Sequence, residues 1–142
     1  MTFADLGVQK PDELTKVPVL DLVALAHILE AGNGELGLLE ELMGIFQHDQ
    51  PPRLDKLKGA VNSGDMAVIK DISHAIRGSA GTMGASRLMV AAGMLETCGL
   101  GHSAAASPEA LFELLVGAYD EARLALGEYL EKNPRGRGEV PN

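Results

Sequence analysis

Residues 71–85 of the chain read Asp-Ile-Ser-His-Ala-Ile-Arg-Gly-Ser-Ala-Gly-Thr-Met-Gly-Ala, and their spacing decides the fold. Wound at about 100° per residue, this stretch and the two residues before it form a helix with two different faces. One face is apolar or small and carries Ile69, Ile72, Ala75, Ile76, Ser79 and Met83. The opposite face carries Lys70, His74, Arg77, Gly78 and Gly81. We therefore expect His74 on the exposed side of a helix whose apolar side packs against other helices.

Glycine is an unusual residue for the exposed face of a helix, because it costs roughly 0.5 to 1 kcal/mol relative to alanine. Nothing in the pattern requires Gly78 or Gly81 to admit a neighbouring helix. A partner could instead approach the backbone at Gly78 and reach the imidazole of His74. Lys70 and Gly81 extend this expected docking surface, although Gly81 fits simple tolerance of glycine equally well. A neutral imidazole keeps a lone pair near pH 7 and can accept a phosphoryl group. Arg77 would then face the charge on the phosphoryl oxygens.

These residues and the stretch that follows them resemble the histidine-containing phosphotransfer (HPt) domain of two-component phosphorelay signalling. Residues 74–80 read His-Ala-Ile-Arg-Gly-Ser-Ala where the family has His-x-x-Lys-Gly-Ser, and Gly84-Ala85, Leu88 and Leu95-Glu96 follow in register. The specific match covers residues 71–96, and a looser pattern extends over most of residues 19–131. One departure is Arg77, where lysine is commoner. Both are cations, but a planar guanidinium and a compact ammonium are not interchangeable.

The resemblance implies an all-α fold, an antiparallel four-helix bundle with an additional N-terminal helix. It also implies that a carboxylate or amide on the next helix hydrogen-bonds one imidazole nitrogen, and the matching position here is Glu96. A carboxylate that accepts from Nδ1–H would leave Nε2 with the free lone pair. The alternative is that Glu96 is an ordinary exposed residue of its helix.

Capping residues and glycines predict the same helices without the resemblance. Good N-caps or first residues stand at four positions: Asp21, Asp65, Ser86 and Ser107. Glycines predict helix ends at residues 32–34, 64, 84 and 99–101, and the last helix continues to about Lys132. A further pattern begins at Leu36, and the Pro51-Pro52 pair either ends it or bends it. Because strand signals are absent and the connections are short, neighbouring helices should pack antiparallel.

We expect three parts along the chain. Residues 1–18 form an N-terminal arm or linker, residues 19–132 form the HPt four-helix bundle domain, and residues 133–142 form a disordered tail. The chain of 142 residues is long enough for one core. Its hydrophobic content of 46% with only 4% aromatic residues predicts that this core is aliphatic.

Composition also limits the partners and the location. A net charge of −8 argues against nucleic acid as a partner. The single cysteine, Cys98, fits a reducing compartment. Without a long apolar run or a signal peptide, the chain is expected to be cytoplasmic, with no direct membrane contact. Cys98 and His102 have the spacing of half a zinc site, but Gly99 and Gly101 interrupt the helix between them, so we expect no metal and no cofactor.

The resemblance predicts a phosphorelay intermediate without kinase activity of its own. It would accept a phosphoryl group on His74 from a receiver-domain aspartyl phosphate and pass it to another response-regulator receiver, within a pathway that includes a hybrid sensor histidine kinase. Any magnesium would belong to the receiver. One alternative is the dimerisation and phosphoacceptor domain of a sensor kinase, but Ala75 stands in place of that family's acidic residue, and Gly78-Ser79 in place of its Thr-Pro. The other is a non-catalytic helical scaffold.

Overall fold

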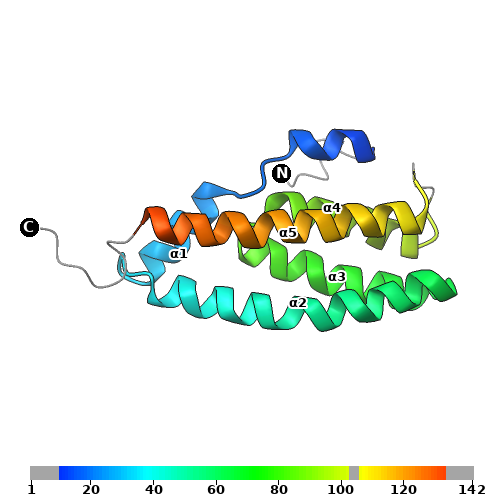
Figure 1. Cartoon of the computed structure of the whole chain (residues 1–142), viewed down its shortest axis with the longest axis horizontal. Helices are drawn as coiled ribbons and strands as arrows, with labels where there is room; N and C mark the ends of the chain where they lie inside the picture. Colours follow the sequence, from blue (N-terminus) through cyan, green and yellow to red (C-terminus); the bar gives the residue numbers. More distant parts are fainter. Residues whose placement is uncertain (1–9, 103–105, 134–142) are drawn as a thin grey trace, which may run out of the picture.

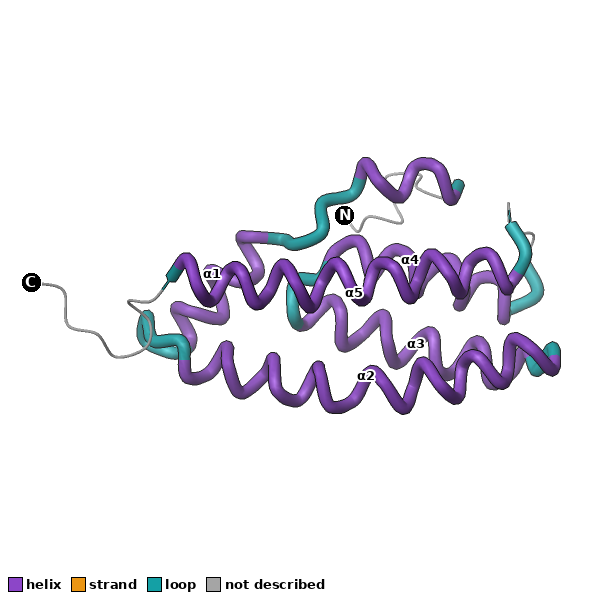
Figure 2. Tube along the Cα trace, in the orientation of Figure 1, coloured by secondary structure: helices purple, strands orange, loops and turns teal. Residues whose placement is uncertain are grey.

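The computed structural model describes residues 10–102 and 106–133, and in this part of the chain the secondary structure is helical. The helices are η2 (Pro11–Lys16), α1 (Leu22–Ala31), α2 (Gly37–Ser63), α3 (Met66–Thr82), α4 (Ser86–Gly99) and α5 (Pro108–Lys132). Helices α2 to α5 lie alongside one another as an antiparallel bundle, and α1 lies at one end of it (Figure 1). Figure 2 shows η2 on the outside of this bundle, where it contacts α4. The predicted all-α bundle with an additional N-terminal helix is confirmed.

Side-chain caps start three of these helices where the sequence predicts them. The carboxylate of Asp21 accepts hydrogen bonds from two backbone N–H groups in the first turn of α1, and that of Asp65 accepts one from the Val68 N–H of α3. The Ser107 hydroxyl caps α5, with Pro108 as the first helical residue. Each cap satisfies N–H groups that have no partner inside the helix. The helix that carries His74 is thus fixed at its start by its own sequence.

Helix α2 differs from the prediction at its two prolines. An end at Pro51-Pro52, one of the two predicted outcomes, is wrong, because α2 continues from Gly37 to Ser63. The prolines deprive the carbonyls of Gln47 and His48 of their N–H partners. Both of these residues are exposed, so water can bond to the carbonyls while the opposite face of α2 remains packed in the core.

The core is aliphatic, as the composition predicts. Its largest fully buried apolar side chains come from all parts of the bundle: Leu25, Leu36, Leu39, Leu57, Ile69, Ile76, Met83, Leu88, Leu95, Leu115 and Leu126. One aromatic pair, Phe46 and Tyr119, joins α2 to α5 with ring centroids 5.8 Å apart. None of the helices in residues 10–102 and 106–133 combines the length and the apolar character needed to cross a membrane.

The segment before α1 packs against the bundle where the structure describes it. Leu14 and Val17 are only 4% and 3% exposed. Arg87 of α4 donates hydrogen bonds to the backbone carbonyls of Val17 and Thr15. Residues 1–9 of the expected arm and residues 134–142 of the expected tail lie outside the described residues.

Candidate functional site

His74 lies in the middle of α3, and its side chain is 66% exposed. The buried residues of α3 are Ile69, Ser73, Ile76 and Ala80. They occupy the opposite side of the helix, so the core fixes which face of α3 meets solvent. The structure thus places the imidazole on the surface, where the helical spacing puts it.

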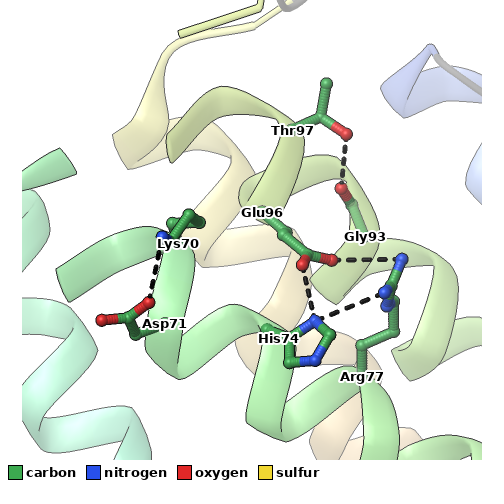
Figure 3. Close-up of polar contacts among 7 residues, drawn as sticks. All are labelled: Lys70, Asp71, His74, Arg77, Gly93, Glu96 and Thr97. Carbon is green, nitrogen blue, oxygen red and sulfur yellow. Dashed lines mark hydrogen bonds and ion pairs between the residues drawn. The ribbon is translucent and has the colours of Figure 1, made fainter. Parts of the chain in front are cut away.

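Glu96 of α4 lies beside the imidazole, although the two residues are 22 positions apart in sequence (Figure 3). Its Oε2 is 2.7 Å from His74 Nδ1, and its side chain is only 12% exposed. An ionised carboxylate can only accept, so the proton of this hydrogen bond is on Nδ1. The neutral ring then has its lone pair on Nε2. The structure therefore brings together the two residues that the resemblance pairs.

Arg77 contacts the same carboxylate from one turn further along α3. Its Nη1 is 3.1 Å from Glu96 Oε1, and its Nη2 is 3.4 Å from His74 Nδ1 (Figure 3). A protonated Nδ1 cannot accept from a guanidinium, so the second contact is a close approach rather than a hydrogen bond. The guanidinium thus pairs with the carboxylate oxygen that does not bond to the ring. The expected role of Arg77 toward the phosphoryl oxygens stays a prediction.

The three expected docking residues differ in their surroundings. Gly78 is exposed, and a Cβ added there would meet nothing within 4 Å. The ammonium of Lys70 pairs with Asp71, with Nζ 3.4 Å from Oδ1. A Cβ at Gly81 would lie 3.3 Å from Met89 Sδ, so the space there is tighter than at Gly78, although the neighbour is the flexible end of a side chain. A docking role for all three residues stays a prediction.

The remaining histidines and the cysteine lie apart from this cluster. His27, His48 and His102 are exposed. Cys98 is buried, and this burial, with a smaller contribution from the charge of Glu109, raises the pKa of its thiol. A raised pKa disfavours the thiolate that binds a metal. In residues 10–102 and 106–133, no three His, Cys, Asp or Glu side chains come together in a way that could hold a metal ion.

Two contacts of the site helices were not predicted. Arg53 of α2 donates to the Ser79 hydroxyl at 2.8 Å, which joins α2 to α3 on the side away from His74. Gly93 of α4 lies under Arg77, whose Cδ would be 3.7 Å from a Cβ at that position. The helical pattern places Ser79 on the inner face but carries no signal for an arginine 26 residues earlier, nor for a glycine on another helix.

Comparison with known proteins places this geometry in a family. No curated protein matches the chain significantly. Residues 41–129 match the family described as Hpt domain. This match runs from within α2 to within α5, covers more than half of the chain, and includes His74, Arg77 and Glu96. The chain belongs to the Hpt domain family, and it therefore has a phosphotransfer role in two-component signalling.

Proposed function

We propose that His74 accepts a phosphoryl group on Nε2 from the aspartyl phosphate of a receiver domain and passes it to a second response-regulator receiver. The observation that carries this proposal is the hydrogen bond of 2.7 Å between His74 Nδ1 and Glu96 Oε2 on an exposed ring. This hydrogen bond leaves Nε2, which carries the lone pair, as the nucleophile.

The same hydrogen bond favours the chemical step. The Nε2 lone pair attacks phosphorus, so a P–N bond forms while the P–O bond to the donor aspartate breaks and its carboxylate leaves. The Nδ1 proton remains on the ring, which becomes more positive as it gives up the lone pair. A carboxylate already placed at Nδ1 stabilises that charge without reorganisation. Glu96 is nearly buried, which strengthens its effect relative to a fully solvated carboxylate.

The backbone at Gly78 supports receiver docking over the ring. Gly78 follows His74 by four residues and therefore lies one turn further along the same face. A Cβ at Gly78 would meet nothing within 4 Å among the described residues, so a receiver can bring its acidic pocket close to Nε2. Lys70 and Gly81 extend this face in the two directions along the helix.

The partners in this proposal are receiver domains and a hybrid sensor histidine kinase. Hpt domains are phosphotransfer modules and not kinases, so ATP is consumed elsewhere in the pathway. Any magnesium that the transfer needs belongs to the receiver's acidic pocket, and this chain supplies no cofactor. We place the transfer in the cytoplasm, which the single cysteine supports because it fits a reducing compartment.

Transfer of label from phosphorylated receivers tests the proposal. The protein is mixed with a panel of receivers carrying labelled phosphate, and we expect a phosphoramidate that survives alkali and is lost in acid. The His74→Gln variant should accept no label and should melt at nearly the parent temperature, because the ring makes no core contact. Incubation with ATP and magnesium alone should give no label, which separates this function from that of a sensor-kinase phosphoacceptor domain.

The matched control is His48→Gln, since His48 is also exposed and also contacts a carboxylate, that of Asp49. It should accept label at the parent rate. Loss of label in His48→Gln but not in His74→Gln would contradict the assignment. Failure of every receiver in the panel to label the protein would favour a scaffold instead.

A further inference from the structure

Helices α3 and α4 meet in a single antiparallel register that runs through the site. Each step of three or four residues forward along α3 is matched by an equal or similar step back along α4. The four pairs of residues that meet are Lys70 with Gly99, His74 with Glu96, Arg77 with Gly93, and Gly81 with Met89. Glycine therefore occurs in three of the four pairs. The neighbours that a Cβ would meet at each of these glycines distinguish the one that the helix crossing requires.

Only Gly99 is required by the backbone of the other helix. A Cβ there would lie 2.6 Å from the backbone nitrogen of Lys70 and 2.9 Å from its Cα, well inside the 3.4 Å at which ordinary contact begins. At Gly81 the neighbour is the flexible end of Met89, and at Gly93 the 3.7 Å distance to Arg77 is an ordinary contact. A side-chain end can rotate away, but a helix backbone moves only with the helix.

The turn after α4 does not explain Gly99. The sequence pattern predicts that residues 99–101 end the helix, and the left-handed conformation that favours glycine is found at Gly101, with φ of 82°. Gly99 is still a helical residue of α4. Its lack of a side chain therefore serves the contact with Lys70 rather than the turn.

This contact lies one helical turn from the site on both helices. Glu96 precedes Gly99 by three residues, and His74 follows Lys70 by four. If α3 and α4 were forced apart here, the long side chain of Arg77 could still reach Glu96. The short His74 side chain has only two torsions and can follow much less, so its hydrogen bond of 2.7 Å to Glu96 would lengthen.

We infer that Gly99 is a positioning residue, which sets the approach of α3 to α4 and so keeps Glu96 at hydrogen-bond distance from His74 Nδ1. The inference rests on the proposed function, because the pairing matters for transfer only if Nε2 is the acceptor. Gly99 acts through Glu96 and does not itself touch the reacting atoms.

The test is Gly99→Ala with two readouts. In the free domain, ¹H–¹⁵N spectra of the imidazole should show a smaller share of the Nδ1–H tautomer than in the parent. Phosphoryl acceptance from a receiver should slow by roughly two- to tenfold, the lower part of the range expected when two residues that act through one contact are uncoupled. In a Glu96→Ala background, which is itself slower than the parent, Gly99→Ala should cause no further loss, because the residue through which it acts is gone.

The matched control is Gly117→Ala, an exposed mid-helix position in α5 where a Cβ meets nothing within 4 Å. It should change neither the tautomer nor the rate. If Gly99→Ala unfolds the parent, it is repeated in a background stabilised by Gly59→Ala and Gly117→Ala. A protein that fails to fold even there would overturn the inference, since the contact would then hold the whole fold rather than the ring.

An unchanged tautomer in folded Gly99→Ala would overturn the inference and leave His74 as the acceptor. An equal loss of rate in the Glu96→Ala background would also overturn it, because the effect would then be independent of Glu96. If no receiver labels the parent protein, the proposed function fails, and the tautomer measurement still reports on the geometry without any receiver.

Discussion

The packing of the free domain does not explain Gly78. It lies in the interior of α3, is exposed, and has no neighbour that a side chain would meet. In such a position glycine is about 1 kcal/mol less favourable than alanine. Gly44, Gly59 and Gly117 are also helical, exposed and open, so this cost alone does not indicate a function. Gly78 differs from them because the exposed imidazole of His74 lies one turn away, where the proposed receiver would dock.

We predict that Gly78→Gln separates stability from transfer. The free energy of unfolding, measured by urea denaturation, should rise by up to about 1 kcal/mol, because a better helix former replaces an exposed glycine. Receiver binding and phosphoryl acceptance should both weaken, because the new side chain would occupy the space over the α3 backbone beside His74.

The control for this prediction is Gly117→Gln, which is also exposed and open but lies in α5. It should be more stable than the parent and transfer at the parent rate. If Gly78→Gln behaved in the same way, the receiver would not dock over Gly78, although His74 could still be the acceptor.

At the scale of the helices, the sequence predicts where a helix begins better than whether it continues through a proline in its interior. Asp21, Asp65 and Ser107 cap their helices as predicted, because a cap depends on residues within one turn. Residues within one turn of Pro51-Pro52 could not decide whether α2 ends or continues there. Whether a helix survives two prolines depends on packing along its whole length, and the local pattern does not contain that information.

Gly84 joins three elements at one point. It has a left-handed backbone with φ of 68°, and a Cβ there would lie 3.0 Å from the carbonyl oxygen of Asp21 and 3.1 Å from Ala24 Cβ. Its own carbonyl accepts from the Asp21 N–H at 2.7 Å. The turn between α3 and α4 is thus also the place where α1 docks.

We predict that Gly84→Ala destabilises the domain more than Gly64→Ala. Gly64 also has a left-handed backbone after a helix, with φ of 72°, but a Cβ there meets nothing within 4 Å. The backbone strain of about 1 to 2 kcal/mol is common to both variants, and crowding against α1 adds to it only at Gly84. Thermal melts of the two variants measure the difference. Equal melting temperatures would mean that α1 shifts freely to make room.

At the scale of the whole molecule, the contacts that complete the site and the fold join residues far apart in the chain. The pairing of Glu96 with His74 was available only through the resemblance, since periodicity places both residues on exposed faces without saying that the faces meet. The Arg53–Ser79 hydrogen bond and the close contact of Gly99 with Lys70 had no sequence signal. They follow from the relative placement of whole helices, which local spacing does not determine.

Arg87 makes the longest-range set of these contacts. It donates from Nε to the Val17 carbonyl at 2.8 Å, from Nη2 to the Thr15 carbonyl at 3.0 Å, and from Nη1 to Glu121 at 2.7 Å. Its side chain is only 16% exposed. One side chain of α4 therefore bonds to α5 and to the segment before α1, and all three of its nitrogens have acceptors.

We predict that Arg87→Ala releases the segment of residues 11–17 from the bundle. Hydrogen bonds from a charged donor contribute about 1.5 to 3 kcal/mol each at most, and the buried Val17 carbonyl would be left without its partner. We expect a loss of roughly 2 kcal/mol in urea denaturation and faster hydrogen exchange in residues 11–17.

The control is Arg123→Ala, because Arg123 is 46% exposed and forms an ion pair with Asp120 of its own helix at 3.4 Å. Exposed pairs of this kind contribute little, so this variant should match the parent within about 0.5 kcal/mol. If Arg87→Ala also matched the parent, burial of Leu14 and Val17 alone would hold the segment, and the hydrogen bonds of Arg87 would add nothing to the stability of the fold.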